Sequence, residues 1–164
     1  NSPFRRKYDP YWKKYYSLGE GYNYLLPHLL GAVARAQIEK FEKSILQKKI
    51  LLGKNYHKIF ETNDINITQK VPKNFKSVYW LNSIYFKNKS VSSIRRIGKF
   101  LEKNGVEVRS GFWPMNKLKN FNSKYVGSER VSENIFDNII VLPSNLNIKY
   151  KDILYFKKLI EKKL

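Results

Sequence analysis

The chain has 164 residues, of which 42% are hydrophobic and 15% aromatic, so it can fold around a sizeable core. It has no cysteine, which excludes disulfides, thiolate metal sites and cysteine nucleophiles and fits a reducing compartment. The formal charge is +19, but only seven of the 32 basic residues are arginine and the lysines are spread over every segment, a pattern that disfavours nucleic acid as the partner.

No apolar run approaches the roughly 18 residues that a membrane span requires, and residues 1–7 are not followed by the apolar stretch of a signal peptide. We therefore expect a cytoplasmic protein without a membrane partner. The chain begins with Asn1 rather than methionine, so we expect it to be processed or to be a piece of something longer.

Residues 1–18 carry aromatic rings with basic residues between them, including Trp12. Such a segment can stack bases, or it can be a loop that packs on a partner surface. We favour the second interpretation.

The next stretch is an aromatic turn punctuated by Gly19 and Gly21, which tolerate backbone angles that other residues resist. Pro27 suits the first helical position, so we expect a helix to begin there. Asn23 lies between them and has two interpretations. It is either a turn residue that bonds nearby backbone or an amide donor placed beside a helix N-terminus, where a phosphate would bind.

A helical pattern then runs from 27 to about 60, with Gly53 as the expected kink. At about 50 Å such a helix is long for a small domain, so we expect it to bridge two bodies. Small residues near its start allow another backbone to come close. Its apolar residues recur at three- and four-residue steps as one stripe: Leu30, Val33, Ala34, Ile38, Phe41 and Ile45.

The remainder alternates between helical and strand patterns. The composition of residues 61–76 predicts a loop or a weak edge strand. Strands are expected at 77–86, 106–109 and 138–143. Helices are expected after the capping serines at 90–93 up to Asn104-Gly105, over 128–137, and over 150–164. The last helix has the expected inner stripe Ile153, Leu154, Phe156, Leu159 and Ile160. The order predicts an α/β fold with three strands covered by helices.

No catalytic constellation is visible from spacing. His28 and His57 stand 29 residues apart on the predicted helix, so they cannot form a compact metal pair, and we expect both to be structural and no metal to be bound. Arg109 is either an exposed charge at a strand end or an anion-recognising group at a cleft rim. Phe112 and Trp113 are either core or pocket wall.

Four stretches carry a resemblance to a known family: residues 21–24, 36–40, 105–115 and 141–144. Together, and in this order, they resemble the C-terminal part of the DegT/DnrJ/EryC1/StrS sugar aminotransferases. The resemblance implies the aspartate-aminotransferase (type I) fold, the cofactor pyridoxal 5'-phosphate and a homodimer. It also implies amino transfer from a donor such as glutamate to a nucleotide-linked keto-sugar, in the synthesis of polysaccharide or glycan precursors.

The resemblance covers nearly the whole chain but only the rear part of the family pattern. It divides the chain into a segment joining to a missing large domain (1–26), a bridging helix (27–60) and a small C-terminal α/β domain (61–164). The lysine that bonds the cofactor belongs to the missing part, so this chain is expected to hold no catalytic residue and to be inactive alone. Some relatives with another residue in place of that lysine are dehydratases.

The resemblance also implies roles for single residues. Asn23 would reach the cofactor phosphate of the neighbouring subunit. Leu25 stands where the family usually has an arginine, and His28 is the candidate substitute for it. The residues implied near the substrate entrance are Tyr24, Arg109, Phe112 and Trp113. Two alternatives stay open: a basic α/β protein that binds nucleic acid, and a dehydratase or inactive member of the family.

Overall fold

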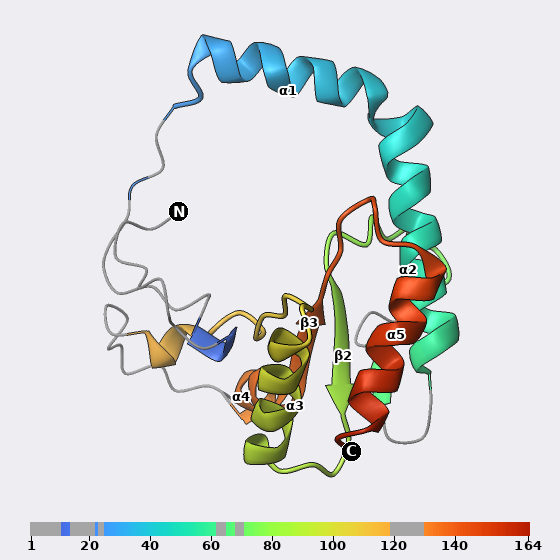
Figure 1. Ribbon diagram of the computed structural model, residues 1–164. Helices are drawn as coiled ribbons and strands as arrows, with labels where there is room; N and C mark the ends of the chain where they lie inside the picture. The colour runs from blue at the N-terminus through green and yellow to red at the C-terminus, as the bar shows by residue number, and fades with distance from the viewer. Residues whose placement is uncertain (1–10, 14–21, 23–24, 62–64, 68–70, 119–129) are drawn as a thin grey trace.

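A computed structural model describes residues 11–13, 22, 25–61, 65–67, 71–118 and 130–164 (Figure 1). Helices and short strands alternate along these residues, which confirms the α/β class. A long helix precedes the small body that contains the sheet. The elements in chain order are a 3-10 turn (Tyr11–Lys13), α1 (His28–Lys40), a π-helical segment (Phe41–Leu46), α2 (Gln47–Phe60), β1 (Ile65–Ile67), β2 (Asn82–Phe86), α3 (Val91–Lys103), a second 3-10 turn (Met115–Lys117), α4 (Arg130–Asn138), β3 (Ile139–Leu142) and α5 (Tyr150–Glu161).

The long helix bends in the π-helical segment, not at Gly53. Figure 1 shows α1 and α2 running in different directions, with α1 extending away from the sheet. Within the segment the hydroxyl of Ser44 donates to the carbonyl of Lys40 at 3.0 Å, a back-bond that commonly bends helices. The predicted kink at Gly53 is therefore wrong. The helix also begins at His28, one residue later than expected, with Pro27 in extended conformation before it.

The sheet has the order β1-β2-β3, and both pairings are antiparallel. The edge strand expected between 61 and 76 and the strand expected within 138–143 are both present, as β1 and β3. The strand expected at 106–109 is wrong, since only Arg109 pairs, in an isolated bridge to Val141. The next backbone N–H, that of Ser110, donates to the carbonyl of Tyr11 at 3.3 Å instead, and this diverts the chain from the sheet.

The strand expected from residue 77 begins only at Asn82. Tyr79 has a φ of 45°, which no extended strand can contain, and its backbone N–H donates to the hydroxyl of Ser77 at 3.1 Å. Its ring lies against Gly53 of α2, where an added Cβ would overlap it. Gly53 thus provides room for a ring rather than a bend in the helix.

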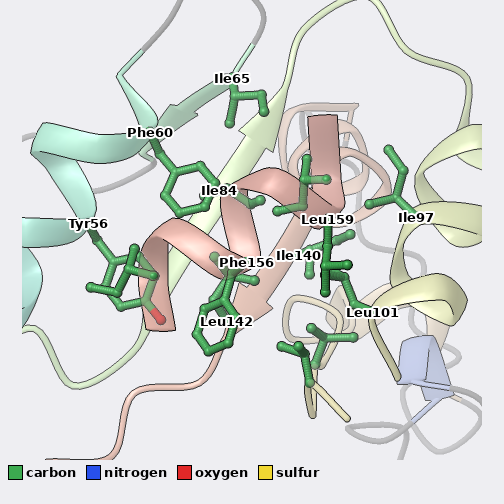
Figure 2. Close-up of a cluster of buried hydrophobic side chains, with 14 of the residues drawn as sticks. Tyr56, Phe60, Ile65, Ile84, Ile97, Leu101, Ile140, Leu142, Phe156 and Leu159 are labelled. Carbon is green, nitrogen blue, oxygen red and sulfur yellow. The ribbon is translucent and has the colours of Figure 1, made fainter. Parts of the chain in front are cut away.

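The core lies between the sheet and helices α2, α3 and α5 (Figure 2). Alternate residues of β2 point into it, as expected for a sheet with one face on the core. On the opposite face, the hydroxyl of Tyr85 lies 3.5 Å from the side-chain oxygen of Asn134 in α4. The core side chains labelled in Figure 2 come from all these elements: Tyr56, Phe60, Ile65, Ile84, Ile97, Leu101, Ile140, Leu142, Phe156 and Leu159.

Local signals located the later helices well. Ser90 caps α3 by accepting from the backbone N–H of Ser93 at 3.2 Å, and Gly105 follows the helix with a φ of 77°. In α5 the predicted inner stripe is right except for Leu154, which is 46% exposed. The start expected for α4 at Ser128 lies outside the described residues. Among the helices that the structure describes, none is long and apolar enough to cross a membrane.

Candidate functional site

An open hollow of about 580 Å³ lies at one end of the sheet. Because β2 and β3 are antiparallel, the residues that precede β2 and those that follow β3 meet at this end (Figure 1). The bridge residue Arg109 and the start of α2 reach the same place. The polar and aromatic side chains among the lining residues are Lys49, Trp80, Glu107, Arg109, Ser144, Asn145 and Phe156.

Lys49 ties α2 to both sides of the hollow. Its ammonium group donates to the carbonyl of Trp80 at 3.2 Å and also to the carbonyl of Ser144. Partial burial lowers the pKa of Lys49, because removal from water disfavours the charged form. A cation is therefore held at the junction where the chain enters β2 and leaves β3.

Arg109 supplies a second cation at the rim. Its backbone N–H and carbonyl both pair with Val141, at 3.1 and 2.8 Å, so the residue is anchored to β3. The guanidinium nitrogen Nη2 lies 2.9 Å from a carboxylate oxygen of Glu107, and the side chain is 37% exposed. Lys49, Arg109 and Glu107 together leave the hollow with a net positive charge.

Two exposed rings stand beside these cations. Trp80 is 65% exposed and Phe112 is 59% exposed. Their ring centroids are 6.2 Å apart with 25° between the planes, so they present a nearly parallel pair of faces. Arg109 and Phe112, two of the predicted substrate-proximal residues, are thus brought to the same end of the sheet.

Trp113 turns the other way. Its indole N–H donates to the carbonyl of Trp12 at 3.0 Å, and its ring lies 4.7 Å from that of Phe136 in α4. These contacts join the N-terminal segment to α4, so Trp113 does not line the hollow.

The described part of the N-terminal segment packs on its own chain. Tyr11 is buried over Gly98 of α3, where an added Cβ would overlap the ring, and its hydroxyl donates to the carbonyl of Ile94 at 3.2 Å. Arg95 and Lys99 each lie 5.2 Å from the ring of Trp12. For Tyr11 and Trp12 the expected packing on a partner surface is therefore wrong; the rest of residues 1–18 lies outside the described residues, apart from Lys13.

The structure describes only some of the residues that are expected to lie at the cofactor. Asn23 and Tyr24 lie outside the described residues. His28 is exposed as the first residue of α1, and the first turn of that helix holds no acidic residue and no side-chain cap. His57 is partly buried against Tyr79, with ring centroids 5.8 Å apart, and its Nε2 atom is buried without a hydrogen-bond partner among the described residues.

Sequence reasoning missed Lys49 and Trp80. The single signal for Trp80 was its place in an aromatic-rich stretch, which was interpreted as strand. Lys49 gave no signal, because nothing distinguishes it from the other lysines until α2 is packed against the sheet. Within the described part of the chain, no three His, Asp or Glu side chains gather as a metal site would require.

Several solved structures are similar to this chain and show the class of fold to which it belongs. Spr1654 of Streptococcus pneumoniae, described as a sugar aminotransferase, matches in its PLP form with a TM-score of 0.74 at 19% identity, covering 85% of this chain and 37% of that one. PseC of Helicobacter pylori, an aminotransferase involved in the biosynthesis of pseudoaminic acid, matches with a TM-score of 0.71 at 20% identity, covering 88% of this chain and 39% of that one.

The E. coli GDP-4-keto-6-deoxy-D-mannose-3-dehydratase with bound hydrated PLP matches with a TM-score of 0.70 at 16% identity, covering 85% of this chain and 36% of that one. The fold is therefore part of the PLP-dependent aminotransferase fold, and the chain spans less than two fifths of the length of these relatives.

The family follows from the sequence. The model of the DegT/DnrJ/EryC1/StrS aminotransferase family matches residues 4–159, and the chain therefore belongs to this family, as the four sequence stretches indicated. No curated protein sequence matches the chain.

Proposed function

We propose that the chain is the C-terminal part of a pyridoxal-phosphate-dependent aminotransferase that acts on a nucleotide-linked keto-sugar. The family match over residues 4–159 carries this proposal. The amino donor is an amino acid such as glutamate, and the product enters polysaccharide or glycan precursors. The cytoplasmic location expected from the sequence remains part of the proposal.

The proposed division of the chain is a connecting segment (1–26), a bridging helix (27–60) and a small domain (61–164). The surface of α1 supports it. No residue of α1 is buried, and three of its polar residues, His28, Arg35 and Glu39, recur at seven- and four-residue steps as one stripe, with Gln37 and Lys40 outside it. Exposed apolar side chains are numerous on α1 and on the residues just before it: Leu25, Leu26, Leu29, Leu30, Val33 and Ile38.

An exposed helix that carries this many large apolar side chains is expected to pack against other protein surface. We therefore assign the surface of α1 to contacts with a large domain and with the second subunit of a homodimer. Gly31 supports this assignment because nothing but the tip of Leu26, at 4.0 Å, lies near the position of its absent Cβ, so another backbone can approach there.

The described residues fit one end of the cofactor, its phosphate. The first turn of α1 presents backbone N–H groups and contains no acidic residue, the arrangement that favours an anion. Asn23 and His28 are the residues of this chain that would hold the phosphate. When bound, pyridoxal phosphate supplies an electron sink for the amino transfer. The lysine that would bond it belongs, in this proposal, to the missing domain, so the chain alone is inactive.

The full-length parent tests the proposal. It is expected to bind pyridoxal phosphate and to convert glutamate and a nucleotide-linked keto-sugar into 2-oxoglutarate and an amino sugar. Replacement of Asn23 by alanine is expected to weaken cofactor retention about tenfold or more, measured by visible absorbance after dialysis, since a hydrogen bond to a charged group is worth about 1.5–3 kcal/mol. Asn74→Ala, at an exposed loop position, is the matched control.

Unchanged affinity for the cofactor in the Asn23→Ala parent would return Asn23 to the role of a turn residue. If the full-length parent binds no pyridoxal phosphate, the proposed function is wrong as a whole. The dehydratase among the structural neighbours makes dehydration the second candidate reaction. A deoxy-keto-sugar product, formed while the amino donor is converted to its 2-oxo acid and ammonia is released, identifies that reaction, because loss of the hydroxyl is a two-electron reduction that the donor supplies.

A further inference from the structure

We propose that the helical side of the small body binds an anionic lipid surface. The proposed contact is the exposed side of α5 together with the exposed Lys54 and Lys58 of α2, and we call it the basic outer surface. None of its residues lines the hollow, so the inference does not depend on the proposed reaction.

The exposed side of α5 carries lysines with two large side chains between them. The residues of α5 that face the core are Ile153, Phe156, Leu159 and Ile160. The residues on the opposite side of the helix are exposed and recur at three-, four- and seven-residue steps: Lys151, Leu154, Tyr155 and Lys158, with Lys162 one turn further on. Leu154 and Tyr155 therefore stand between ammonium groups on one side of the helix.

This surface extends beyond one helix. Helix α5 contacts both α2 and α3 and lies between them (Figure 1). On the α2 side, the ammonium of Lys58 lies 6.0 Å from the centroid of the Tyr150 ring, and the exposed Lys54 precedes Lys58 by about one turn. On the α3 side, the ammonium of Lys163 lies 4.8 Å from the centroid of the Phe100 ring. The helices thus present a continuous, lysine-rich surface.

Acidic residues offset these lysines only in part. Helix α2 contains no acidic residue, and Glu61 follows its C-terminal end. In α5, a carboxylate oxygen of Asp152 accepts from the backbone N–H of Lys149 at 2.8 Å, and a carboxylate oxygen of Glu161 lies 3.7 Å from the ammonium of Lys157. The basic outer surface therefore keeps a net positive charge, which complements an anionic partner.

The type of cation favours lipid headgroups over nucleic acid. Neither α2 nor α5 contains arginine, whose planar fork suits bidentate recognition of a single phosphate. Lysine is a compact charge on a flexible stem, and such charges are attracted to an anionic membrane without a fixed geometry. Leu154 can enter the edge of the acyl region, and a tyrosine ring such as that of Tyr155 suits the boundary between headgroups and water.

Surface attachment differs from the membrane contact that the sequence disfavours. The expectation of no membrane partner rests on the lack of an apolar run long enough to span a bilayer and of a signal peptide. Attachment to a surface requires neither, because charge attraction and shallow insertion of side chains supply it. The cytoplasmic leaflet carries the anionic lipids, so the inference agrees with the proposed cytoplasmic location.

Co-sedimentation of the chain with vesicles tests the inference. The chain is expected to bind vesicles of equal parts phosphatidylglycerol and phosphatidylcholine at low salt, and to bind vesicles of phosphatidylcholine alone much more weakly. Sodium chloride is expected to weaken this binding because it screens the attraction.

Two variants separate the contributions of charge and apolar contact. Lys151→Gln combined with Lys158→Gln is expected to weaken binding to the anionic vesicles about twentyfold, since each lysine near such a surface contributes about fivefold. Leu154→Ser is expected to weaken binding several-fold at every salt concentration, because salt does not screen an apolar contact.

Lys73→Gln combined with Lys76→Gln is the matched control. It removes the same charge at exposed positions on the approach to β2, outside the basic outer surface, and is expected to bind nearly as tightly as wild type. Circular dichroism verifies that each variant is folded. The same series in the full-length parent removes any contribution from the apolar surface of α1, which the proposed large domain and second subunit cover.

Several results would overturn the inference. One is a lack of binding by the folded chain, or by the full-length parent, to the anionic vesicles at low salt. Another is an equal loss of binding in the two double variants, since the net charge alone would then be responsible. If vesicles do not bind, but an oligonucleotide or poly-glutamate binds and depends on Lys151 and Lys158, the surface belongs to a nucleic acid or to an acidic protein instead.

The proposed function is tested separately. Amino transfer by the parent is expected to be the same with and without Lys151→Gln and Lys158→Gln, because these residues do not line the hollow. Vesicle binding by a parent that transfers no amino group supports the inference and removes the function.

Discussion

Gly53 is the residue on which the approach to the hollow depends. Its missing Cβ leaves room for the ring of Tyr79, whose positive φ sets the direction of the chain before Trp80. Replacement of Gly53 by alanine is expected to destabilise the chain by about 1–3 kcal/mol through overpacking, although alanine is the better helix former by about 1 kcal/mol. Urea unfolding followed by circular dichroism measures the change.

Gly31→Ala is the matched control for that experiment. Gly31 is also inside a helix, but an added Cβ there would meet only the tip of Leu26 at 4.0 Å. The chain with Gly31→Ala is expected to be more stable by up to about 1 kcal/mol. If Gly53→Ala gave the same gain, the ring of Tyr79 could not be fixed where the structure has it.

Tyr56 links stability to alkaline pH. Its hydroxyl donates to the carbonyl of Pro143 at 2.7 Å, and burial, aided by the charge of Asp152, raises the pKa of Tyr56 well above its ordinary value of about 10. The folded chain keeps this proton while the unfolded chain releases it. The free energy of unfolding is therefore expected to hold steady below about pH 10 and to fall above it, as unfolded tyrosine ionises.

Tyr56→Phe is expected to make this alkaline fall shallower, while lowering stability near neutral pH by about 1 kcal/mol because the carbonyl of Pro143 loses its donor. Urea unfolding at a series of pH values measures both effects. Tyr155→Phe is the control, since Tyr155 is 46% exposed. An equal fall with pH in wild type and Tyr56→Phe would show that Tyr56 is not the group responsible. Burial also raises the pKa of Tyr11, which keeps part of the fall in the variant.

At the scale of elements, the sequence predicts the features that neighbouring residues determine, such as helix caps and turns. The cap at Ser90 and the positive φ of Gly105 bound α3, and both are readable from side-chain type alone. The strand expected at 106–109 failed because the donor of Ser110 goes to Tyr11, almost a hundred residues away in the chain. The bend after α1 was misplaced because glycine is a weak helix former, whereas in the structure α2 continues through Gly53 and the ring of Tyr79 packs on that residue.

The apolar surface of α1 gives the prediction at this scale. Val33 is 56% exposed, so Val33→Asp is expected to change the stability of this chain by no more than about 0.5 kcal/mol. In the full-length parent the same change is expected to prevent dimer formation, because it puts a charge into an apolar interface. Analytical ultracentrifugation of the parent measures its mass. Arg35→Gln, on the polar stripe, is the control, and an intact dimer with Val33→Asp would contradict the assignment of this surface.

At the scale of the whole molecule, the candidate site is assembled from four separate stretches of chain. Arg109 and Phe112 were singled out because they share one stretch with a family resemblance. Lys49 and Trp80 could not be found in the same way, since their roles depend on the packing of α2 against the sheet and on a positive φ at Tyr79. A sequence pattern can show that residues belong to one stretch that resembles a known family, but it cannot show which residues are brought together by helix packing or by an unusual backbone angle.

The net charge of +19 is also a property of the whole molecule. The ion pairs Arg35–Glu39 in α1 and Lys157–Glu161 in α5 each join neighbours on one helix turn near the surface and contribute little stability. Mutual repulsion among the many lysines therefore dominates, and the free energy of unfolding is expected to rise as salt shortens the screening length from about 30 Å at 0.01 M to about 8 Å at 0.15 M. Urea unfolding across a chloride series measures this rise.

Sulfate distinguishes general screening from binding at the hollow. At equal ionic strength sulfate is expected to stabilise the chain more than chloride does, partly through its exclusion from protein surface and partly by binding at Lys49 and Arg109. The second part is expected to disappear in Arg109→Gln, while the response to chloride stays the same. A fall in stability with chloride would show that attractive ion pairs outweigh repulsion. Tight, salt-sensitive retention of an oligonucleotide at low salt would instead favour the nucleic acid alternative, because counterion release makes such binding weaken steeply as salt rises.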